Sequence, residues 1–198
     1  MANNINQEIE VRLQVDDDIE PLLEFFKRVA KFLEKSNQVD FYFDSPQKTF
    51  IYTDPKGYKN ADEWLRVRIS KKNSICYKKW YRDKNTGKSL YADEIEINIE
   101  DGKKLITLLE RLGFKQISVI EKNRESWKYG DFRFDCDKIK GLGSFIEIEF
   151  TGKINDSTKG RKKIFNLLKD LGIKNWKVIG GGYPWMLWNK DKNLFEKS

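Results

Sequence analysis

The sequence of 198 residues contains no histidine. That absence excludes Ser-His-Asp and Cys-His catalysis, imidazole general bases and zinc held by histidine. The two cysteines, Cys76 and Cys136, lie far apart and form no CxxC motif, so packed thiols in a reduced, cytoplasmic protein are expected. No apolar run approaches a membrane span and no signal-peptide pattern is visible, so no membrane partner is expected. Chemistry must therefore depend on carboxylates, lysine, arginine, tyrosine or a metal held by oxygen.

What the chain does contain is charge. Charged residues make up 35% of it, aromatic residues 14%, and the formal net charge is +7. This composition predicts a globular protein with affinity for anions, which include phosphate compounds, nucleic acid and acidic membrane surfaces.

Hydrophobic periodicity predicts three helices and a larger number of short strands. The helices are expected from Asp16 to about Lys35, from Asp101 to Gly113, and from Ser157 to Gly172. Strands are expected at 7–13, 38–44, 49–53, 63–70, 75–81, 91–99, 114–125, 131–138, 144–150 and 174–179. With no linker in sight, residues 1–188 are predicted to form one domain, followed by a polar, frayed tail at 189–198.

One pattern of alternation recurs along these strands. In residues 7–13, Glu8, Glu10 and Arg12 share one face of the strand and apolar residues share the other. The acidic pattern returns at 94–97 and 147–150, and basic counterparts stand at 66–69 and 122–124. Paired carboxylates and paired cations indicate one shared site for a polyanion and metal ions.

These faces favour an α+β fold in which an antiparallel sheet of about eight or nine strands closes into a barrel with helices packed outside. Its lumen would be lined by Glu8, Glu10, Arg12, Arg66, Arg68, Lys78, Lys122, Arg124, Asp137, Glu147 and Glu149. Buried, unpaired charges are costly, and a polyphosphate with divalent cations would satisfy both signs. The alternative is an open sheet whose charged faces meet water.

The motifs also resemble the CYTH, or triphosphate tunnel metalloenzyme, superfamily. Its Glu-x-Glu-x-Lys strand stands here as 8–12, its Tyr-Phe-Asp element as 42–44, and its Arg-x-Arg strand as 66–68. A Tyr-Lys strand end, a Lys-x-Arg strand, an acidic stretch before Gly-Leu-Gly and a closing Glu-x-Glu follow at 77–78, 122–124, 137–143 and 147–149. The run from Gly141 to Glu149 is closest to class IV adenylyl cyclases.

The resemblance implies roles for these residues. Metal ions, Mg²⁺ or Mn²⁺, would be held by Glu8, Glu10, Asp137, Glu147 and Glu149. The triphosphate would be bound by Arg12, Arg66, Arg68, Lys78, Lys122 and Arg124. Asp137, Arg12 and Lys78 would be catalytic, with Asp137 accepting or orienting the proton of the attacking hydroxyl. Asp137 is preferred to Asp135, which lies on the same strand face, because of its position before the Gly-Leu-Gly turn.

The expected activity is conversion of ATP to cyclic AMP and pyrophosphate. The alternatives are hydrolysis of thiamine triphosphate, inorganic triphosphate or a nucleoside or RNA triphosphate, and binding of nucleotide, polyphosphate or RNA without catalysis. Nucleic acid is expected to be a substrate only where it carries a 5′-triphosphate. Both a monomer and a homodimer are compatible with the sequence. Arg12 stands where the family has lysine, and 91–93 lack the family's arginine near the middle Glu-x-Glu, which leaves Glu94 and Glu96 less secure.

Overall fold

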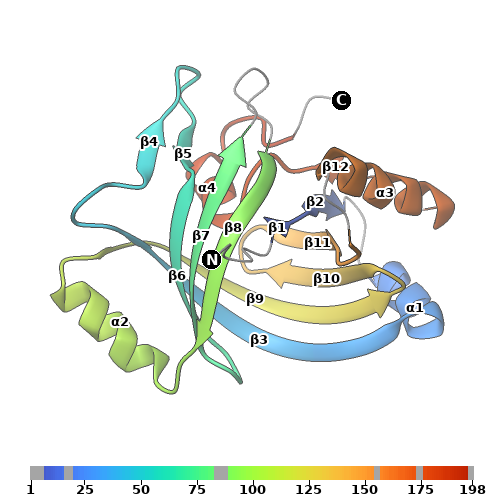
Figure 1. Ribbon diagram of the computed structural model, residues 1–198, viewed down its shortest axis with the longest axis horizontal. Coiled ribbons are helices and arrows are strands. Elements are labelled where there is room, and N and C mark those ends of the chain that lie inside the picture. Colours follow the sequence, from blue (N-terminus) through green and yellow to red (C-terminus); the bar gives the residue numbers. More distant parts are fainter. Residues whose placement is uncertain (1–6, 16–19, 83–88, 154–156, 173–175, 196–198) are drawn as a thin grey trace.

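The computed structural model describes residues 7–15, 20–82, 89–153, 157–172 and 176–195 (Figure 1). The helices are α1 (Glu20–Val29), α2 (Gly102–Arg111), α3 (Ser157–Asp170) and α4 (Tyr183–Trp188). The strands are β1 (Gln7–Glu8), β2 (Glu10–Val15), β3 (Lys31–Asp44), β4 (Ile51–Thr53), β5 (Lys59–Ala61), β6 (Glu63–Ile69), β7 (Ser74–Arg82), β8 (Ser89–Asn98), β9 (Lys115–Tyr129), β10 (Phe132–Ile139), β11 (Gly143–Phe150) and β12 (Trp176–Val178).

One large antiparallel sheet organises the molecule. Its ten strands follow the order β1-β8-β7-β6-β3-β9-β10-β11-β2-β12, and β4 and β5 form a separate ribbon. The sheet is strongly curved, with β6, β7 and β8 rising across the long strands β3 and β9 (Figure 1). The predicted α+β class is confirmed. The predicted closure into a barrel stays a prediction, because the pairing order ends at β1 and β12 instead of returning on itself.

The main apolar core lies on the outer face of β2, β10 and β11. Val11 and Leu13 alternate with Glu10 and Arg12 along β2, and only the apolar pair is buried in this core. Helices α1 and α3 cover this face, burying Phe26 and Leu168 completely. Burial of each such side chain is worth about 1.5–3 kcal/mol. The apolar face is thereby anchored, so Glu10 and Arg12 point to the opposite face of the sheet.

Strand β9 has the reverse arrangement. Lys122 and Arg124 are buried, whereas Glu121 and Asn123 are exposed and Glu125 is half-buried. Strand β3 pairs with β9 along most of its length and likewise buries Asp40. The inside of this part of the sheet is therefore polar, and its charges are paired with one another.

Several local expectations are confirmed. Helix α2 begins after the N-cap Asp101, whose side chain accepts a hydrogen bond from the Lys104 amide, and the chain leaves the helix through Gly113 at φ +87°. Helix α3 occupies the predicted segment. No helix among the residues that the structure describes is long and apolar enough to cross a membrane.

Other local expectations are wrong. The first helix ends at Val29 rather than near Lys35, because Lys31–Asp44 pairs with β9. The ring centres of Phe32 and Trp127 lie 5.0 Å apart across this pairing. Strand pairing there overrides a helical spacing of apolar residues. The expected start of this helix at 16–19 lies outside the described residues.

The C-terminal segment is more ordered than expected. Residues 183–188 form the unpredicted helix α4, and β5 was also not predicted. Asn189 is buried and its side chain bonds to Lys59 and Trp185, while Phe195 bridges to Ile179. The structure thus gives the tail contacts as far as Phe195, and residues 196–198 lie outside the described part; the predicted boundary at residue 188 stays a prediction.

Candidate active site

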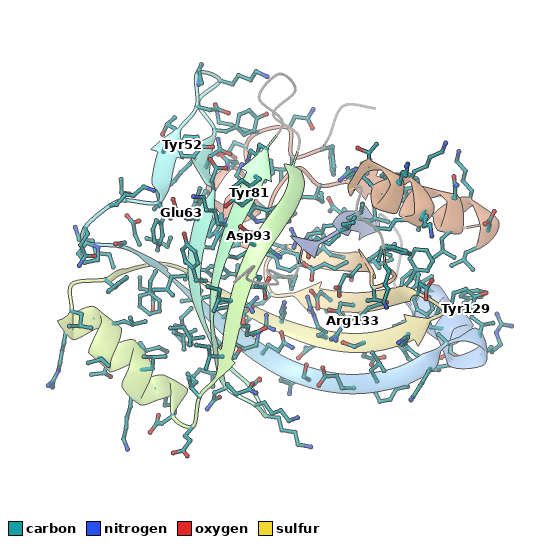
Figure 2. The ribbon with its side chains drawn as sticks, in the orientation of Figure 1. Tyr52, Glu63, Tyr81, Asp93, Tyr129 and Arg133 are labelled. Carbon is teal, nitrogen blue, oxygen red and sulfur yellow. The ribbon has the colours of Figure 1, made fainter. Side chains whose placement is uncertain are left out.

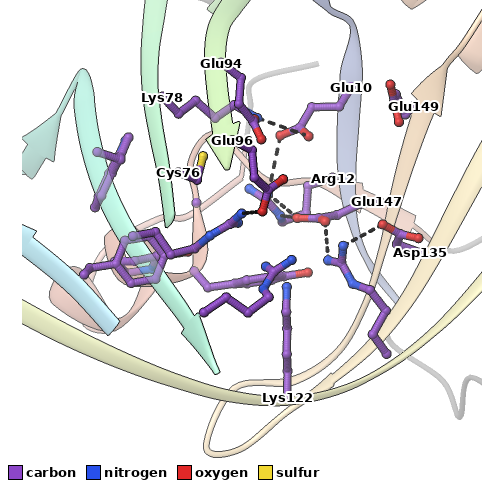
Figure 3. Close-up of a pocket in the computed structure, with 18 of the residues that line it drawn as sticks. Glu10, Arg12, Cys76, Lys78, Glu94, Glu96, Lys122, Asp135, Glu147 and Glu149 are labelled. Carbon is purple, nitrogen blue, oxygen red and sulfur yellow. Dashed lines mark hydrogen bonds and ion pairs between the residues drawn. The ribbon is translucent and has the colours of Figure 1, made fainter. Parts of the chain in front are cut away.

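A cavity of about 250 Å³ opens on the concave side of the sheet. Strands from both arms of the sheet contribute side chains to it, as does the segment before α4 (Figure 3). Seven basic and six acidic residues line it: Arg12, Arg66, Arg68, Lys78, Lys122, Arg124 and Arg133, and Glu10, Glu94, Glu96, Asp135, Glu147 and Glu149. Figure 2 shows Arg133 beside β10, with Tyr81 and Asp93 on the β7–β8 side.

Strands β2 and β11 present carboxylates and one arginine together. Their register places Glu10 opposite Glu149 and Arg12 opposite Glu147. Arg12 Nε donates to Glu147 Oε1 at 2.7 Å, Nη1 donates to the Gly181 carbonyl at 2.7 Å, and Nη2 contacts both Glu147 and Glu10. Burial acts to raise the pKa of Glu147, but Arg12 and Arg124 outweigh it and hold that pKa well below its usual range.

Strand β6 carries two arginines with different surroundings. Arg68 makes a two-point contact with Asp40, from Nε at 2.6 Å and from Nη2 at 2.8 Å. Arg66 donates from Nη2 to Glu96 at 3.1 Å, whereas its buried Nε has no hydrogen-bond partner among the described residues. Leaving a buried donor unsatisfied costs free energy, and Arg66 is one of the arginines that line the cavity.

Lys78 of β7 lies between two carboxylates. Its Nζ is 3.1 Å from Glu94 and 3.7 Å from Glu10, and 4.7 Å from the centre of the Trp80 ring. The neighbouring Cys76 also lines the cavity, and burial raises the pKa of its thiol to about 12. That thiol stays protonated at neutral pH and is a poor nucleophile.

Lys122 reaches the cavity from the floor formed by β9. Its Nζ is 3.7 Å from Asp40 and 3.6 Å from Asp137. Burial and then the neighbouring Arg124 lower the pKa of Lys122 to about 8, against the opposite effect of the two carboxylates. Its charge therefore changes close to physiological pH.

Asp137 lies behind the cavity wall. It is completely buried, accepts a 2.7 Å hydrogen bond from Arg124 Nε and another of 2.7 Å from the Tyr183 hydroxyl, and does not line the cavity. Asp135, the residue set aside in its favour, does line it and accepts from Arg124 Nη1 at 2.5 Å. Arg124 and Tyr183 cover Asp137 on the cavity side, and its predicted role at the site stays a prediction.

Nine of the eleven predicted site residues do line the cavity: Glu10, Arg12, Arg66, Arg68, Lys78, Lys122, Arg124, Glu147 and Glu149. Of the other two, Asp137 is described above, and Glu8 lies in β1 with its side chain outside the described part. Asp40, Tyr183 and Arg133 were missed. Asp40 shares a strand face with Tyr42, so alternation could have identified it; no pattern pointed to Tyr183.

The carboxylates fit a hard divalent cation in their chemistry. Glu10 and Glu149 stand opposite each other on neighbouring strands and supply oxygen atoms only, the ligands that Mg²⁺ and Mn²⁺ prefer. Among the residues that the structure describes, however, no group of three carboxylates is gathered closely enough to hold a metal ion. Arginine and lysine side chains occupy the spaces between these carboxylates instead.

Comparison with known proteins agrees with this geometry. A family model described as the CYTH domain matches residues 6–183. A protein of Methanocaldococcus jannaschii described as a candidate adenylate cyclase is 32% identical over 178 residues, which cover 89% of this chain and 95% of the relative.

Solved structures with the same fold include a Pyrococcus horikoshii protein and a Hippeastrum protein. The first has a TM-score of 0.72 and 29% identity, covering 92% of this chain and 99% of its own. The second has a TM-score of 0.64 and 18% identity, covering 94% and 97%, and is described as a candidate adenylyl cyclase with a dominant triphosphatase activity. The resemblance drawn from the strand motifs is confirmed: the chain belongs to the CYTH domain family.

Proposed function

We propose that this protein is a divalent-metal-dependent enzyme acting on triphosphates, and that it converts ATP to cyclic AMP and pyrophosphate as class IV adenylyl cyclases do. The observation that carries the proposal is the cavity itself, in which seven cations, Arg66 among them, face six carboxylates. A phosphate oxygen is the acceptor that an arginine donor of this kind prefers. The similarity to the Methanocaldococcus jannaschii protein supports the choice of nucleotide.

The proposed site is a tunnel in one domain spanning residues 1–188. Gln7 and Glu8 pair with β8, Glu10–Val15 pairs with β11, and Ile9 alone separates the two short strands. If β1 and β2 act as one strand, that strand joins the two arms of the sheet and completes the barrel. The cavity between the arms would then be the lumen.

The triphosphate is placed against Arg66, Arg68, Lys78 and Lys122. These four side chains come from β6, β7 and β9, and line one side of the cavity. Arg68 and Lys122 are held by Asp40, so they are oriented before a ligand arrives. Fixed cations bind the triphosphate and stabilise the negative charge that passes to the pyrophosphate leaving group.

The cation that we propose is Mg²⁺ or Mn²⁺, held by Glu8, Glu10, Glu147 and Glu149. When bound, it would neutralise phosphate charge and help to orient the reacting phosphate. Asp137 is proposed as a support for Arg124 instead of a metal ligand or proton acceptor, since it lies outside the cavity lining. Arg124 in turn orients Glu147 and Asp135 through its two terminal nitrogens.

A triphosphatase is the second candidate. The same cation wall can hold a triphosphate whose terminal phosphorus is attacked by water, and the Hippeastrum protein with this fold is described as mainly a triphosphatase. A binder without turnover is the third candidate, because a phosphate-binding wall requires no chemistry.

Product analysis separates the three. The protein is incubated with ATP, and separately with inorganic triphosphate, each with Mg²⁺ or Mn²⁺ and with EDTA as the metal-free control. Cyclic AMP with pyrophosphate supports the cyclase, and phosphate release supports the triphosphatase. Binding without either product would overturn the enzymatic proposal. An Arg111→Gln variant, changed on the exposed surface of α2, serves as the matched arginine control.

A further inference from the structure

Arg12 lies between two cavities. Besides the cavity of about 250 Å³, a smaller one of about 60 Å³ is lined by Gly180, Gly181, Gly182 and Trp185 and by parts of the strands. Five residues line both cavities: Glu10, Arg12, Trp64, Trp80 and Gly182. The Arg12 guanidinium and the glycine segment that it contacts therefore stand at the boundary between the two spaces.

The donors of Arg12 are committed to protein acceptors on two sides. Nε and Nη2 meet Glu147 on β11, and Nη1 meets the Gly181 carbonyl at 2.7 Å. The guanidinium carbon also lies 4.6 Å from the centre of the Tyr183 ring. Arg66 differs, since its Nε is unsatisfied and its Nη2 donates to Glu96.

The segment held by Arg12 has little freedom to move independently. The Ile179 amide donates to the Arg12 carbonyl at 2.9 Å. The backbone of Arg12 therefore binds this segment at Ile179, and the side chain of Arg12 binds it at Gly181. A Cβ on Gly181 would lie 2.5 Å from Cδ2 of Trp185, which shows how closely the segment packs on α4. Tyr183, which follows, donates to Asp137 and lines the larger cavity.

Lysine could not make the same set of contacts. A guanidinium is a planar fork that reaches Glu147 along one edge and Gly181 along another, whereas an ammonium is a compact point charge. With lysine at position 12, the contact with Glu147 or the contact with Gly181 would be lost.

We propose that Arg12 is a positioning and specificity-determining residue, and not a triphosphate ligand: it closes the substrate cavity at one end by fastening the glycine segment 180–182. Gly182 of that segment lines the cavity, so the segment forms part of the cavity wall. Loss of the Arg12–Gly181 contact would join the two cavities and admit a longer anion. The statement about the length of the bound anion rests on the proposed function. The statement that Arg12 fastens the glycine segment 180–182 does not.

The test combines hydrogen exchange with binding of two probes, inorganic triphosphate and a linear polyphosphate of about ten phosphates. In Arg12→Lys we expect amides of 179–188 to exchange about fivefold to tenfold faster, the effect of one hydrogen bond, with β9 and β10 unchanged. Triphosphate affinity should stay within about threefold of the wild type, and the affinity ratio of long to short probe should rise about fivefold to tenfold.

Two further variants make the result decisive. Gly181→Ala displaces the same segment while keeping Arg12, and should reproduce the rise in the affinity ratio. Arg66→Lys should weaken triphosphate binding without accelerating exchange in 179–188. If Arg12→Lys weakens triphosphate binding as much as Arg66→Lys and leaves exchange in 179–188 unchanged, Arg12 is a phosphate ligand and the proposal is wrong. Faster exchange throughout the chain would also overturn it. A wild-type protein that binds neither probe would refute the proposed function, while the exchange result would still decide the fastening role.

Discussion

The two walls of the cavity carry similar cations but use them differently. Facing β10 and β11, Arg12 of β2 and Arg124 of β9 donate to Glu147, Asp135, Asp137 and Gly181. On the β6–β7–β9 side, Arg66 keeps an unsatisfied Nε. Positive charge alone therefore does not identify a phosphate ligand. Arg66 differs from Arg12 and Arg124 in the donors already committed to protein acceptors, whereas Arg68 and Lys122 of the same wall are paired with Asp40.

The largest expected effect on stability concerns Asp137, which pairs with the buried Arg124. Asp137→Asn would remove the carboxylate that binds Nε of the buried Arg124 and leave only Asp135 and Glu147 to compensate its charge. Leaving a buried charge unpaired costs about 3–5 kcal/mol of the free energy of unfolding, and because two partners remain we expect a loss at the lower end of that range. Denaturant titration of the variant measures it, and a loss below about 1 kcal/mol, as for exposed pairs, would show that Arg124 does not depend on Asp137.

The next effect tests the carboxylates facing the cations. Glu10→Gln combined with Glu149→Gln should lower metal-dependent turnover at least about 100-fold, since even outer partners of metal ligands are worth 10–100-fold. Metal-free binding of inorganic triphosphate should not weaken, because two negative charges leave the cavity. Turnover assays and calorimetry measure the two arms. Unchanged turnover would contradict the metal assignment.

A smaller effect follows from Lys122. Its pKa of about 8 means that it is charged below pH 8 and neutral above it. A bound triphosphate favours the charged form, so affinity should fall about tenfold between pH 7 and pH 9, the worth of one charge-assisted hydrogen bond. Calorimetry across this range gives the profile, with Lys122→Met as the reference for titration of the ligand itself. Identical profiles for the two proteins would exclude Lys122 from the binding wall.

The smallest effect lies on the outer face of the same strand. Glu121 of β9 is exposed and pairs with Lys140 at 2.8 Å. Lys140→Gln should change the free energy of unfolding by about 0.5 kcal/mol or less and leave triphosphate affinity unaltered. A large change in either quantity would mean that inside and outside of β9 are not as distinct as the burial pattern indicates.

Sequence patterns were sufficient for the faces of the strands. Alternation correctly placed Glu10 with Arg12 and Glu147 with Glu149 on the cavity side, because the apolar residues between them must be buried. Asp101 and Gly113 correctly marked the ends of α2, since capping is a local interaction.

Depth and long-range contacts could not be predicted in this way. Alternation says that Asp135 and Asp137 share a face, but not that Asp137 is covered by Arg124 and Tyr183. The strand character of Lys31–Lys35 depends on pairing with β9, which is distant in the sequence. The role of Tyr183 depends on the packing of the C-terminal segment against Arg12, which no local pattern encodes.

Calorimetric titration of inorganic triphosphate, without metal at pH 7, tests the central comparison most directly. The cation wall of β6, β7 and β9 predicts that the wild type and Arg111→Gln bind alike, and that Arg66→Gln binds about 10–100-fold more weakly, the worth of hydrogen bonds to a charged group. Equal affinity of Arg66→Gln and the wild type, or no binding by the wild type, would contradict the assignment of this wall as the triphosphate site.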